Sequence, residues 1–399
     1  MVLVSVGRRT HGEGSSQDST LMMMKRVNKL YESICSVENL MLADHTARRG
    51  KQNSFGVMLH DRNREQNIGE LNGLLLSKRF KTSAYDNFLL NCDNGKIREI
   101  SRLPYFPDRI VHHAVMNVME PIWMSVFTAD TYSCIKGRGI HLAAKKIKKA
   151  LDEDPNETIY CLKLDVRKFY PSIDHQILKN ILRQKIKDKD LLWLLDEIID
   201  SAPGVPIGNY LSQYFANLYL AYFDHWIKEE KGVKYYYRYC DDMVIFGKEK
   251  SELHALKVLI AEYLTTKLKL QVKDNWQVFP IAKRGVDFLG YRFWHTHALL
   301  RKSIKKSFAI KMAKSRGKPL ERSFAAYWGW AKHCNSYNLI KKLTNEKVFG
   351  TGGENRGSND REQNKHYANY ESRNNGVGLQ DRGQQVSKEQ KREMLIPSG

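Results

Sequence analysis

The sequence predicts an α+β fold that contains an antiparallel sheet, and three observations support this prediction. Residues 158–166 form an apolar run that is typical of a buried strand and carries an aspartate near its end. Residues 233–247 are typical of a β-hairpin, with an aromatic strand, a tight turn and an apolar strand. Elsewhere, apolar residues recur at helical spacing. With 399 residues and 42% hydrophobic content, the chain can bury a sizeable core divided over two or three subdomains.

The segments before the first strand are predicted to be mostly helical. Residues 24 to about 93 mix short helical patterns with basic loops. A helix is expected over residues 108–116, and another over residues 140–151, whose outer face carries four lysines. One face of the earlier helix collects the apolar residues Ile110, Ala114 and Val118.

Helices and short strands also alternate in the second half of the chain. Two helices are expected after residue 166, through about Ile199, and a long helix is expected from Gly208 through Trp226. Residues 251–267 form a further helical pattern, and residues 302–343 form a basic helical module. Short strands are expected near Leu270, Val278 and Phe288.

The composition changes abruptly after Phe349. The stretch to Gly399 is rich in Gly, Asn, Gln, Glu and Arg and contains few large apolar residues. Such a segment cannot bury enough surface to offset its chain entropy, so we expect it to be disordered. A binding tail and an inert extension are both compatible with this composition.

The charge balance favours a polyanionic partner. The chain has 65 Lys and Arg against 44 Asp and Glu, a net charge of +21. Its 20 Tyr and 7 Trp supply rings for base and sugar contacts, which favours nucleic acid. A protein that is merely basic is the alternative.

Cysteine spacing and hydropathy indicate a cytosolic protein. The six cysteines include no C-x-x-C pair, so we expect reduced thiols rather than a zinc ribbon or a disulfide framework. No stretch approaches the roughly 18 apolar residues that a membrane span needs. The first residues lack the apolar region of a signal peptide, and we expect the folded protein to begin near Met24 after a dispensable leader.

Three aspartates are candidates for a metal site. Asp241 and Asp242 lie at the predicted hairpin turn, and Asp165 ends a predicted strand 76 residues before Asp241. Concentrating three carboxylates is electrostatically costly unless a cation binds, and Mg²⁺ prefers such oxygen ligands. Asp241–Asp242 alone is more simply an ordinary polar turn. The strand-end position of Asp165 and the basic composition favour the metal site.

At these residues the sequence resembles reverse transcriptases. Residues 239–242 resemble their Y-x-D-D box, and residues 165–170 resemble their first catalytic strand. The resemblance covers roughly residues 30–345, where Arg98 and residues 104–115 resemble the fingers block of group II intron-like enzymes. It implies a right-hand polymerase fold with fingers, palm and helical thumb, an antiparallel palm sheet, and RNA-directed DNA synthesis with two Mg²⁺ ions. The implied divisions are a disordered leader (1–23), fingers (24–157), palm with some fingers elements (158–295), thumb (296–349) and a disordered polar tail (350–399).

The resemblance also implies roles for individual residues. The catalytic residues are Asp165, Asp241 and Asp242, and the metal ligands are these three and Val166. The nucleotide-binding residues are Arg98, Phe169, Tyr170, Ile207, Gly208, Ser212, Gln213 and Lys273. The primer grip is Phe288, Leu289, Gly290 and Tyr291.

Several of these roles have simpler alternatives. Tyr170, implied as the steric gate that rejects a 2′-hydroxyl, could be a core aromatic residue. Arg98, implied as a bidentate triphosphate ligand, could be a plain surface arginine. Lys267 and Lys269 lie close to Lys273 in the sequence, and either could be the lysine beside the triphosphate instead. Ser212 and Gln213 could instead cap or pack the start of a helix.

Residues 205–213 indicate which group of reverse transcriptases the sequence resembles. Many relatives have P-Q-G followed by Ser-Pro, whereas this chain has Ile207 in place of the glutamine and Gln213 in place of the proline. This pattern is similar to reverse transcriptases of diversity-generating retroelements. That family makes cDNA with frequent errors opposite template adenine, and the cDNA then rewrites a variable gene region.

The resemblance implies partners and leaves two other interpretations open. The implied partners are template RNA, a cDNA or primer strand, deoxynucleoside triphosphates and a small basic accessory variability protein. A bacterial or phage-encoded cytoplasmic enzyme is expected. One alternative is a stand-alone group II-like or retron-type reverse transcriptase. The other, a non-catalytic RNA-binding scaffold, gives no reason to retain three clustered carboxylates.

Overall fold

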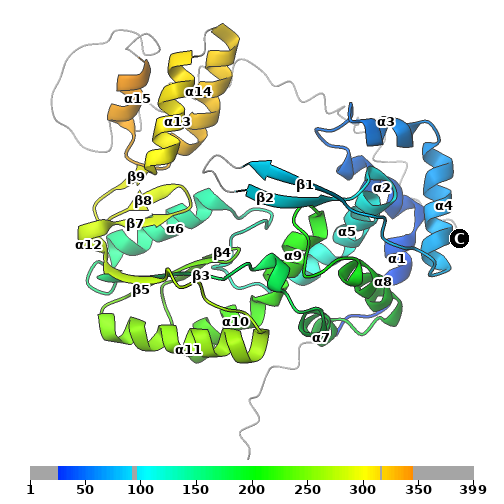
Figure 1. Ribbon diagram of the computed structural model, residues 1–399, viewed down its shortest axis with the longest axis horizontal. Helices are drawn as coiled ribbons and strands as arrows, with labels where there is room; N and C mark the ends of the chain where they lie inside the picture. Colours follow the sequence, from blue (N-terminus) through cyan, green and yellow to red (C-terminus); the bar gives the residue numbers. More distant parts are fainter. Residues whose placement is uncertain (1–25, 92–96, 315–316, 345–399) are drawn as a thin grey trace, which may run out of the picture. The chain divides into compact units, whose positions relative to one another are not determined.

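The computed structural model describes residues 26–91, 97–314 and 317–344 and divides the chain into two compact units at Arg301 (Figure 1). The predicted disordered leader and tail lie outside the described residues. Among the described helices, none combines the length and hydrophobicity that a membrane span needs. The mixture of helices and antiparallel sheets confirms the predicted α+β class.

Helices make up most of the region before the central sheet. The N-terminal helices are α1 (Tyr31–Cys35), α2 (Val37–Ala47), α3 (Phe55–Asp61) and α4 (Arg64–Leu76). A π-helical turn, Tyr105–Arg109, leads into α5 (Ile110–Met124), which extends the helix predicted over residues 108–116. Helix α5 packs against α1, α2 and α9 (Tyr210–Tyr219).

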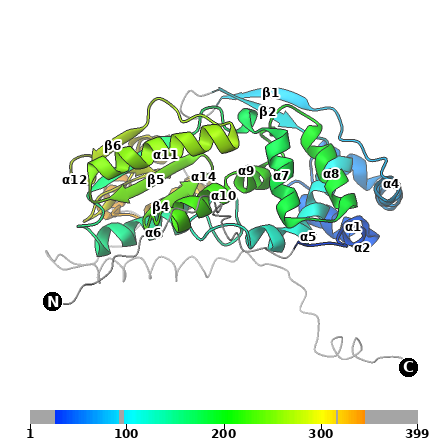
Figure 2. The ribbon, with the colours of Figure 1, turned by 90° about the horizontal axis from the view of Figure 1, so that it is seen from below.

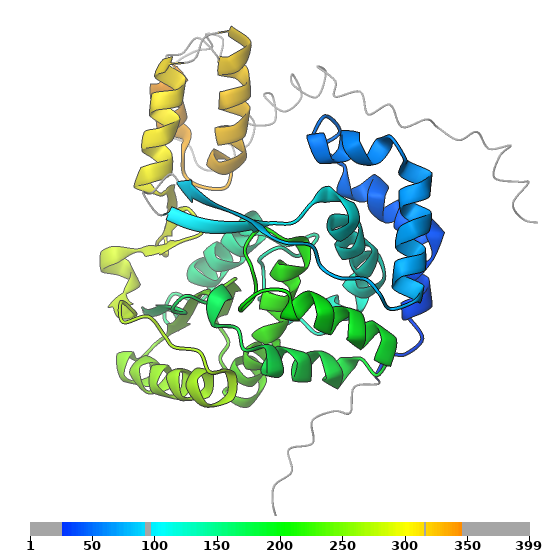
Figure 3. The ribbon, with the colours of Figure 1, turned by 45° about the vertical axis from the view of Figure 1, so that its right-hand side comes forward.

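A β-hairpin that the sequence patterns did not reveal separates α4 from α5. Its strands are β1 (Asp86–Asn91) and β2 (Ile97–Arg102), paired antiparallel with Asp86 opposite Arg102. All six residues of β1 are exposed, so apolar and polar positions do not alternate by burial as in a half-buried strand. The hairpin, drawn in cyan, extends away from the N-terminal helices (Figure 3).

The central sheet has four antiparallel strands in the order β4-β5-β3-β6. They are β3 (Tyr160–Asp165), β4 (Tyr236–Tyr239), β5 (Asp242–Gly247) and β6 (Gln277–Pro280). This confirms the predicted strand at residues 158–166 and the hairpin at residues 233–247. Helix α11 (Lys250–Leu268) packs along β3, β5 and β6 (Figure 2).

The pairing register gives this sheet two different faces. Leu164 lies opposite Met243, and these residues belong to the buried core that also includes α11. Because strand side chains alternate between faces, the opposite face presents Lys163, Asp165 and Asp242. One face of the sheet is therefore apolar, and the other is charged at the end that carries Asp165 and Asp242.

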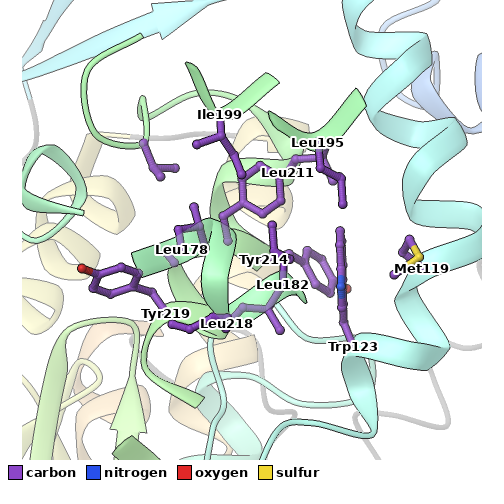
Figure 4. Packing of buried hydrophobic residues seen from close by; sticks show 14 of the residues in the cluster. Met119, Trp123, Leu178, Leu182, Leu195, Ile199, Leu211, Tyr214, Leu218 and Tyr219 are labelled. Carbon is purple, nitrogen blue, oxygen red and sulfur yellow. The ribbon is translucent and has the colours of Figure 1, made fainter. Parts of the chain in front are cut away.

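Three helices form the core beside the sheet. Helices α7 (His175–Lys185) and α8 (Lys189–Asp200) follow β3, as expected, and α7 packs against both α8 and α9. Figure 4 shows how their apolar side chains meet those of α5. The residues labelled there are Met119, Trp123, Leu178, Leu182, Leu195, Ile199, Leu211, Tyr214, Leu218 and Tyr219.

Two details differ from the predictions. The helix expected from Gly208 to Trp226 is divided into α9, α10 (Ala221–His225) and a π-helical turn (Trp226–Glu230). Helix α9 ends where the buried Leu220 adopts φ −99° and ψ 0°. Leu270 is not in a strand: Lys269 ends α11 in a left-handed conformation, and Leu270 donates its N–H to the Leu264 carbonyl.

A second sheet and one helix complete the first unit. Strands β7 (Val286–Phe288), β8 (Tyr291–Phe293) and β9 (Ala298–Leu300) form an antiparallel meander after the short helix α12 (Ile281–Arg284). Helix α6 (Ile140–Glu153), predicted over residues 140–151, packs against β4 and β8. The second unit contains α13 (Lys302–Lys314), α14 (Gly317–Ala331) and α15 (Tyr337–Thr344), as its basic helical pattern predicted.

Candidate active site

The sheet register brings the three candidate aspartates together. Asp165, the last residue of β3, lies directly opposite Asp242, the first residue of β5. Asp241 belongs to the two-residue turn that joins β4 to β5, next to Cys240. Cys240 has φ +58°, a left-handed conformation that is uncommon for a residue with a side chain. The predicted cluster of carboxylates is therefore present at the charged end of the sheet.

Burial and the neighbouring Asp165 disfavour the charged forms of Asp241 and Asp242. Burial raises the pKa of Asp241 to about 7, and the hydrogen bond and negative charge of Asp165 act in the same direction. Burial likewise raises the pKa of Asp242 to about 6, although Lys163 opposes the shift. A bound cation would remove this penalty.

The donor atoms fit a hard divalent cation. Asp165 Oδ1 and Asp242 Oδ1 are both buried without a hydrogen-bond partner among the described residues, so each has a free lone pair for a ligand. Carboxylate oxygens are the donors that Mg²⁺ prefers. The arrangement is not a closed metal cage, since no group of three or more His, Cys, Asp or Glu within the described ranges could by itself hold an ion. A site completed by substrate phosphates has this open character.

Two lysines occupy the space beside the carboxylates. Lys273 forms an ion pair with Asp165 Oδ2 and also donates its backbone N–H to the Asp165 carbonyl at 2.8 Å. The Nζ atom of Lys163 lies 3.8 Å from Asp242 Oδ2. Val166 is fully buried and forms an isolated antiparallel bridge with Val272. Lys273 thus lies at the carboxylates, where the resemblance implied a triphosphate ligand.

Tyr170 contacts the turn that carries Asp241. It begins a short 3₁₀ turn after β3, and its hydroxyl lies 3.1 Å from Cys240 Sγ. Burial raises the pKa of Tyr170, with Cys240 contributing in the same direction. Phe169 is buried and meets the Tyr170 ring edge-on, with ring centroids 5.5 Å apart. The half-buried Tyr170 ring therefore lies against both the core and the candidate site.

The segment with Ile207 and Gly208 lies between Tyr170 and the β1–β2 hairpin. Val205 donates its N–H to the Tyr170 carbonyl at 2.9 Å, and Ser101 of β2 donates to the Ile207 carbonyl at 2.8 Å. Gly208 has φ +127°, and a Cβ there would lie 2.7 Å from the Ser101 carbonyl oxygen. A side chain at position 208 would therefore force this segment away from β2.

The remaining predicted nucleotide-binding residues lie on α9 and β2. Ser212, in the first turn of α9, is buried, whereas its neighbour Gln213 is exposed. Arg98 is exposed on β2 opposite Leu90. No hydrogen bond or ion pair of the described residues joins Arg98 to the carboxylates. The structure thus leaves Arg98 outside the cluster.

The predicted primer-grip residues form a tight hairpin between β7 and β8. Leu289 (φ +53°) and Gly290 (φ +84°) are the two turn residues, while Phe288 and Tyr291 are fully buried. The Tyr291 hydroxyl lies 3.2 Å from Nδ1 of His141 in α6. The hairpin is therefore fixed to α6 by its buried aromatic residues.

A cleft of about 360 Å³ opens beside Asp165 and Asp242, and most of its basic lining was not predicted. Asp287 organises this lining: its carboxylate accepts a hydrogen bond from Arg301 Nε, and its carbonyl accepts one from Lys163 Nζ, both at 2.6 Å. Lys163 was predictable, because it lies two residues before Asp165 on the same strand face. The basic side chains of the lining are Lys163, Arg284, Arg292 and Arg301.

The chain is similar to several known proteins. The family model "Reverse transcriptase (RNA-dependent DNA polymerase)" matches residues 86–293, a range that contains all three aspartates. Protein YkfC of Escherichia coli (strain K12) is 26% identical over 263 residues, which are 55% of this chain and 68% of that protein. The group II intron-encoded protein LtrA of Lactococcus lactis subsp. cremoris is 24% identical over 155 residues, which are 36% of this chain and 25% of LtrA. The chain thus spans a quarter of the length of that relative.

Part of the chain is also similar to solved structures of telomerases. Telomerase from Candida albicans in complex with a fragment of telomeric RNA gives a TM-score of 0.42 at 10% identity, covering 68% of this chain and 61% of the other. Apo telomerase from Candida tropicalis gives 0.44 at 11% identity, covering 66% and 56%.

Proposed function

Because the chain belongs to the reverse transcriptase (RNA-dependent DNA polymerase) family, we propose that it copies an RNA template into DNA at Asp165, Asp241 and Asp242. The observation that carries the proposal is the pairing of Asp165 opposite Asp242, with Asp241 in the adjoining turn. In this proposal Asp165, Val166, Asp241 and Asp242 hold two Mg²⁺ ions, which supply Lewis-acid stabilisation of the attacking and leaving oxygens.

The chain's other residues bind and orient the substrates. Tyr170 supports the sugar of the incoming nucleotide and excludes a 2′-hydroxyl. Gly208 lets the segment with Ile207 lie against Ser101 of β2, and Ser212, Gln213, Phe169 and Arg98 complete the nucleotide site. Lys273 exchanges its pairing with Asp165 for the triphosphate, and the hairpin Phe288–Tyr291 positions the primer end. We assign the fingers, palm and thumb to residues 24–157, 158–295 and 296–349.

Extension of a DNA primer on an RNA template tests this function. The purified chain should incorporate deoxynucleotides in the presence of Mg²⁺, and a chelator should stop the reaction. Binding of the template without any extension, at all metal concentrations tried, would instead favour the RNA-binding scaffold.

Within this activity, we propose an enzyme of a diversity-generating retroelement. The support is the residue pattern with Ile207, Gly208, Ser212 and Gln213. The proposal includes errors at template adenines, mutagenic retrohoming, a small basic accessory variability protein, and a cytoplasmic enzyme of bacterial or phage origin. Sequencing of cDNA made on one RNA template tests it, because errors should concentrate at adenines. A near-identical repeat pair that differs at adenines in the neighbouring DNA would be independent support.

A stand-alone group II-like or retron-type reverse transcriptase is the second candidate. The similarity to the intron-encoded protein LtrA favours it. Errors spread evenly over the four template bases, and no adenine-variant repeat in the neighbouring DNA, would support this candidate.

A further inference from the structure

Two residues before Cys240, the chain buries an ion pair. Arg238 of β4 and Asp224 of α10 both have 0% of their side chains exposed. Arg238 Nε donates to Asp224 Oδ1 at 2.7 Å, and Nη2 donates to Asp224 Oδ2. Removing two charges from water is costly, so such a pair requires further hydrogen bonds to persist.

The remaining polar atoms of the pair are satisfied by three different elements. Asp224 also accepts hydrogen bonds from the Tyr236 hydroxyl at 2.5 Å and from Thr131 Oγ1 at 2.8 Å. Arg238 Nη1 donates to Asn217 Oδ1 of α9 at 3.2 Å. Backbone bonds join Arg238 to residues 130 and 132 on the other side. Arg238 therefore ties α9, α10 and the segment around Thr131 to β4.

One donor of Arg238 reaches the turn of the candidate active site. Arg238 Nη1 also donates to the Cys240 carbonyl at 2.9 Å. Cys240 has the left-handed conformation described above and precedes Asp241 directly. A side chain disfavours that conformation, so the turn needs external support to keep it.

We propose that Arg238, held by Asp224, is a positioning residue that fixes the Cys240 carbonyl and thereby the orientation of Asp241 and Asp242. This proposal depends on the proposed polymerase function, because it gives the network a role in that reaction. Arg238 contacts no reacting atom and acts only through the turn.

A purely structural role for Arg238 predicts that a variant without its guanidinium group keeps the wild-type kcat as long as it folds. Loss of Arg238 alone leaves Asp224 as an unpaired buried charge, which could prevent folding whatever its catalytic effect. Replacing a buried ion pair by apolar residues of similar size often restores stability. In the triple variant Arg238→Met, Asp224→Leu, Tyr236→Phe, the charges are gone, and Thr131 keeps the Thr128 hydroxyl at 3.1 Å. The donor to the Cys240 carbonyl is still missing.

Primer extension and thermal unfolding should be measured on the triple variant and on Arg238→Lys, which keeps the charge but lacks the guanidinium fork. We expect kcat to fall about 100-fold in the triple variant and about tenfold in Arg238→Lys. The Kd for primer–template should stay within about twofold, because the binding surfaces are unchanged. If the triple variant does not fold, Arg238→Lys decides the question.

Asp44→Asn is the matched control. Asp44 is also fully buried and accepts hydrogen bonds from Arg48, Arg64 and Tyr105, but it lies in α2. Its variant should lower the unfolding temperature without lowering kcat below that temperature. A folded triple variant or Arg238→Lys protein with wild-type kcat would overturn the proposal. Absence of Mg²⁺-dependent extension by the wild-type chain would instead refute the proposed function.

Discussion

The carboxyl groups of Asp165, Asp241 and Asp242 meet at one end of the central sheet, and this leads to the first prediction. Asp165→Ala or Asp241→Ala should lower primer extension by about a thousandfold or more, because several kcal/mol of transition-state stabilisation is lost. RNA binding and the unfolding temperature should change little, because both side chains lie at the end of the sheet and burial already disfavours the charged form of Asp241. Asp242→Ala should have a smaller effect.

Asp190→Ala provides the control for this prediction. Asp190 lies in the first turn of α8 and pairs with Lys78 at the surface, so its loss should leave extension unchanged. Robust extension by the Asp241→Ala protein with Mg²⁺ would contradict the proposed mechanism.

The second residue-scale prediction concerns sugar selection by Tyr170. Tyr170→Val should admit ribonucleotides, because it removes the ring that clashes with a 2′-hydroxyl. Tyr170→Phe should keep the selectivity, since it keeps the ring and loses only the contact with Cys240 Sγ. Single-nucleotide incorporation kinetics with paired deoxy- and ribonucleotides measure both. If Tyr170→Val discriminates between deoxy- and ribonucleotides as well as the wild type does, Tyr170 is a core-packing residue and not the steric gate.

The third residue-scale prediction concerns how Ile207 affects the fidelity of DNA synthesis. An isoleucine offers the nucleotide only a dispersive surface, whereas a glutamine can hydrogen-bond near the sugar and hold a paired nucleotide. Each 1.4 kcal/mol or so of lost difference between correct and incorrect pairs costs about tenfold in selectivity. We expect Ile207→Gln to lower misincorporation opposite adenine several-fold, with smaller changes opposite other bases.

Ile207→Val is the matched control, because it remains apolar and leaves the backbone bond from Ser101 in place. Sequencing of cDNA from one RNA template, with any required accessory protein present, measures the error rates. Equal adenine error rates for Ile207→Gln and wild type would show that the infidelity arises elsewhere.

At the residue scale, the sequence predicted what its local pattern encodes. Asp165 and the Asp241–Asp242 pair were recognisable because each ends or begins a strand. Asp287, Arg292 and Arg301 were not, because their approach to Lys163 depends on a separate sheet folding over the first. Sequence spacing contains no information about that packing.

At the scale of elements, α6 offers the clearest electrostatic prediction. Its buried side is made of small and aliphatic residues, while Lys145, Lys146 and Lys148 are exposed and form no ion pair among the described residues. Changing these three lysines to glutamine should reduce the slope of log Kd against log salt for RNA by about 2, provided each contacts one phosphate.

The same changes at Lys250, Lys257 and Lys267 of α11 are the control, because they remove equal charge from a different helix. Fluorescence anisotropy over a salt series measures both slopes. Equal reductions in the two variants would mean that net charge, rather than the surface of α6, sets the affinity.

The features that the sequence did not predict have no local signal in it. The β1–β2 hairpin has no buried face, so the alternation that indicates a strand is absent. The break at Leu220 lies within a continuous apolar pattern, and tertiary packing rather than local preference decides it. Strongly amphipathic helices such as α6 were located correctly, because their buried apolar residues recur at helical spacing in the sequence.

At the scale of the whole molecule, the central sheet is assembled from segments far apart in the chain. Strand β3 is paired on one side with β5 and on the other with β6, which begins more than a hundred residues after β3 ends. The sequence predicted these strands but not the order β4-β5-β3-β6, because each apolar run could pair with any other. Domain boundaries at residues 157, 295 and 349 remain predictions.

The register of β3 has a consequence for how the gene tolerates lost codons. Tyr160 is anchored opposite both Gly247 and Pro280, so deleting one codon within β3 would turn Asp165 toward the apolar face or move it out of line with Asp242. An in-frame deletion of Leu162 should therefore inactivate the enzyme as completely as Asp165→Ala, although every aspartate is still encoded. Deletion of Asn156, in the exposed turn before the strand, should be tolerated. A codon-deletion library scored by cDNA yield would show whether β3 is intolerant to shortening.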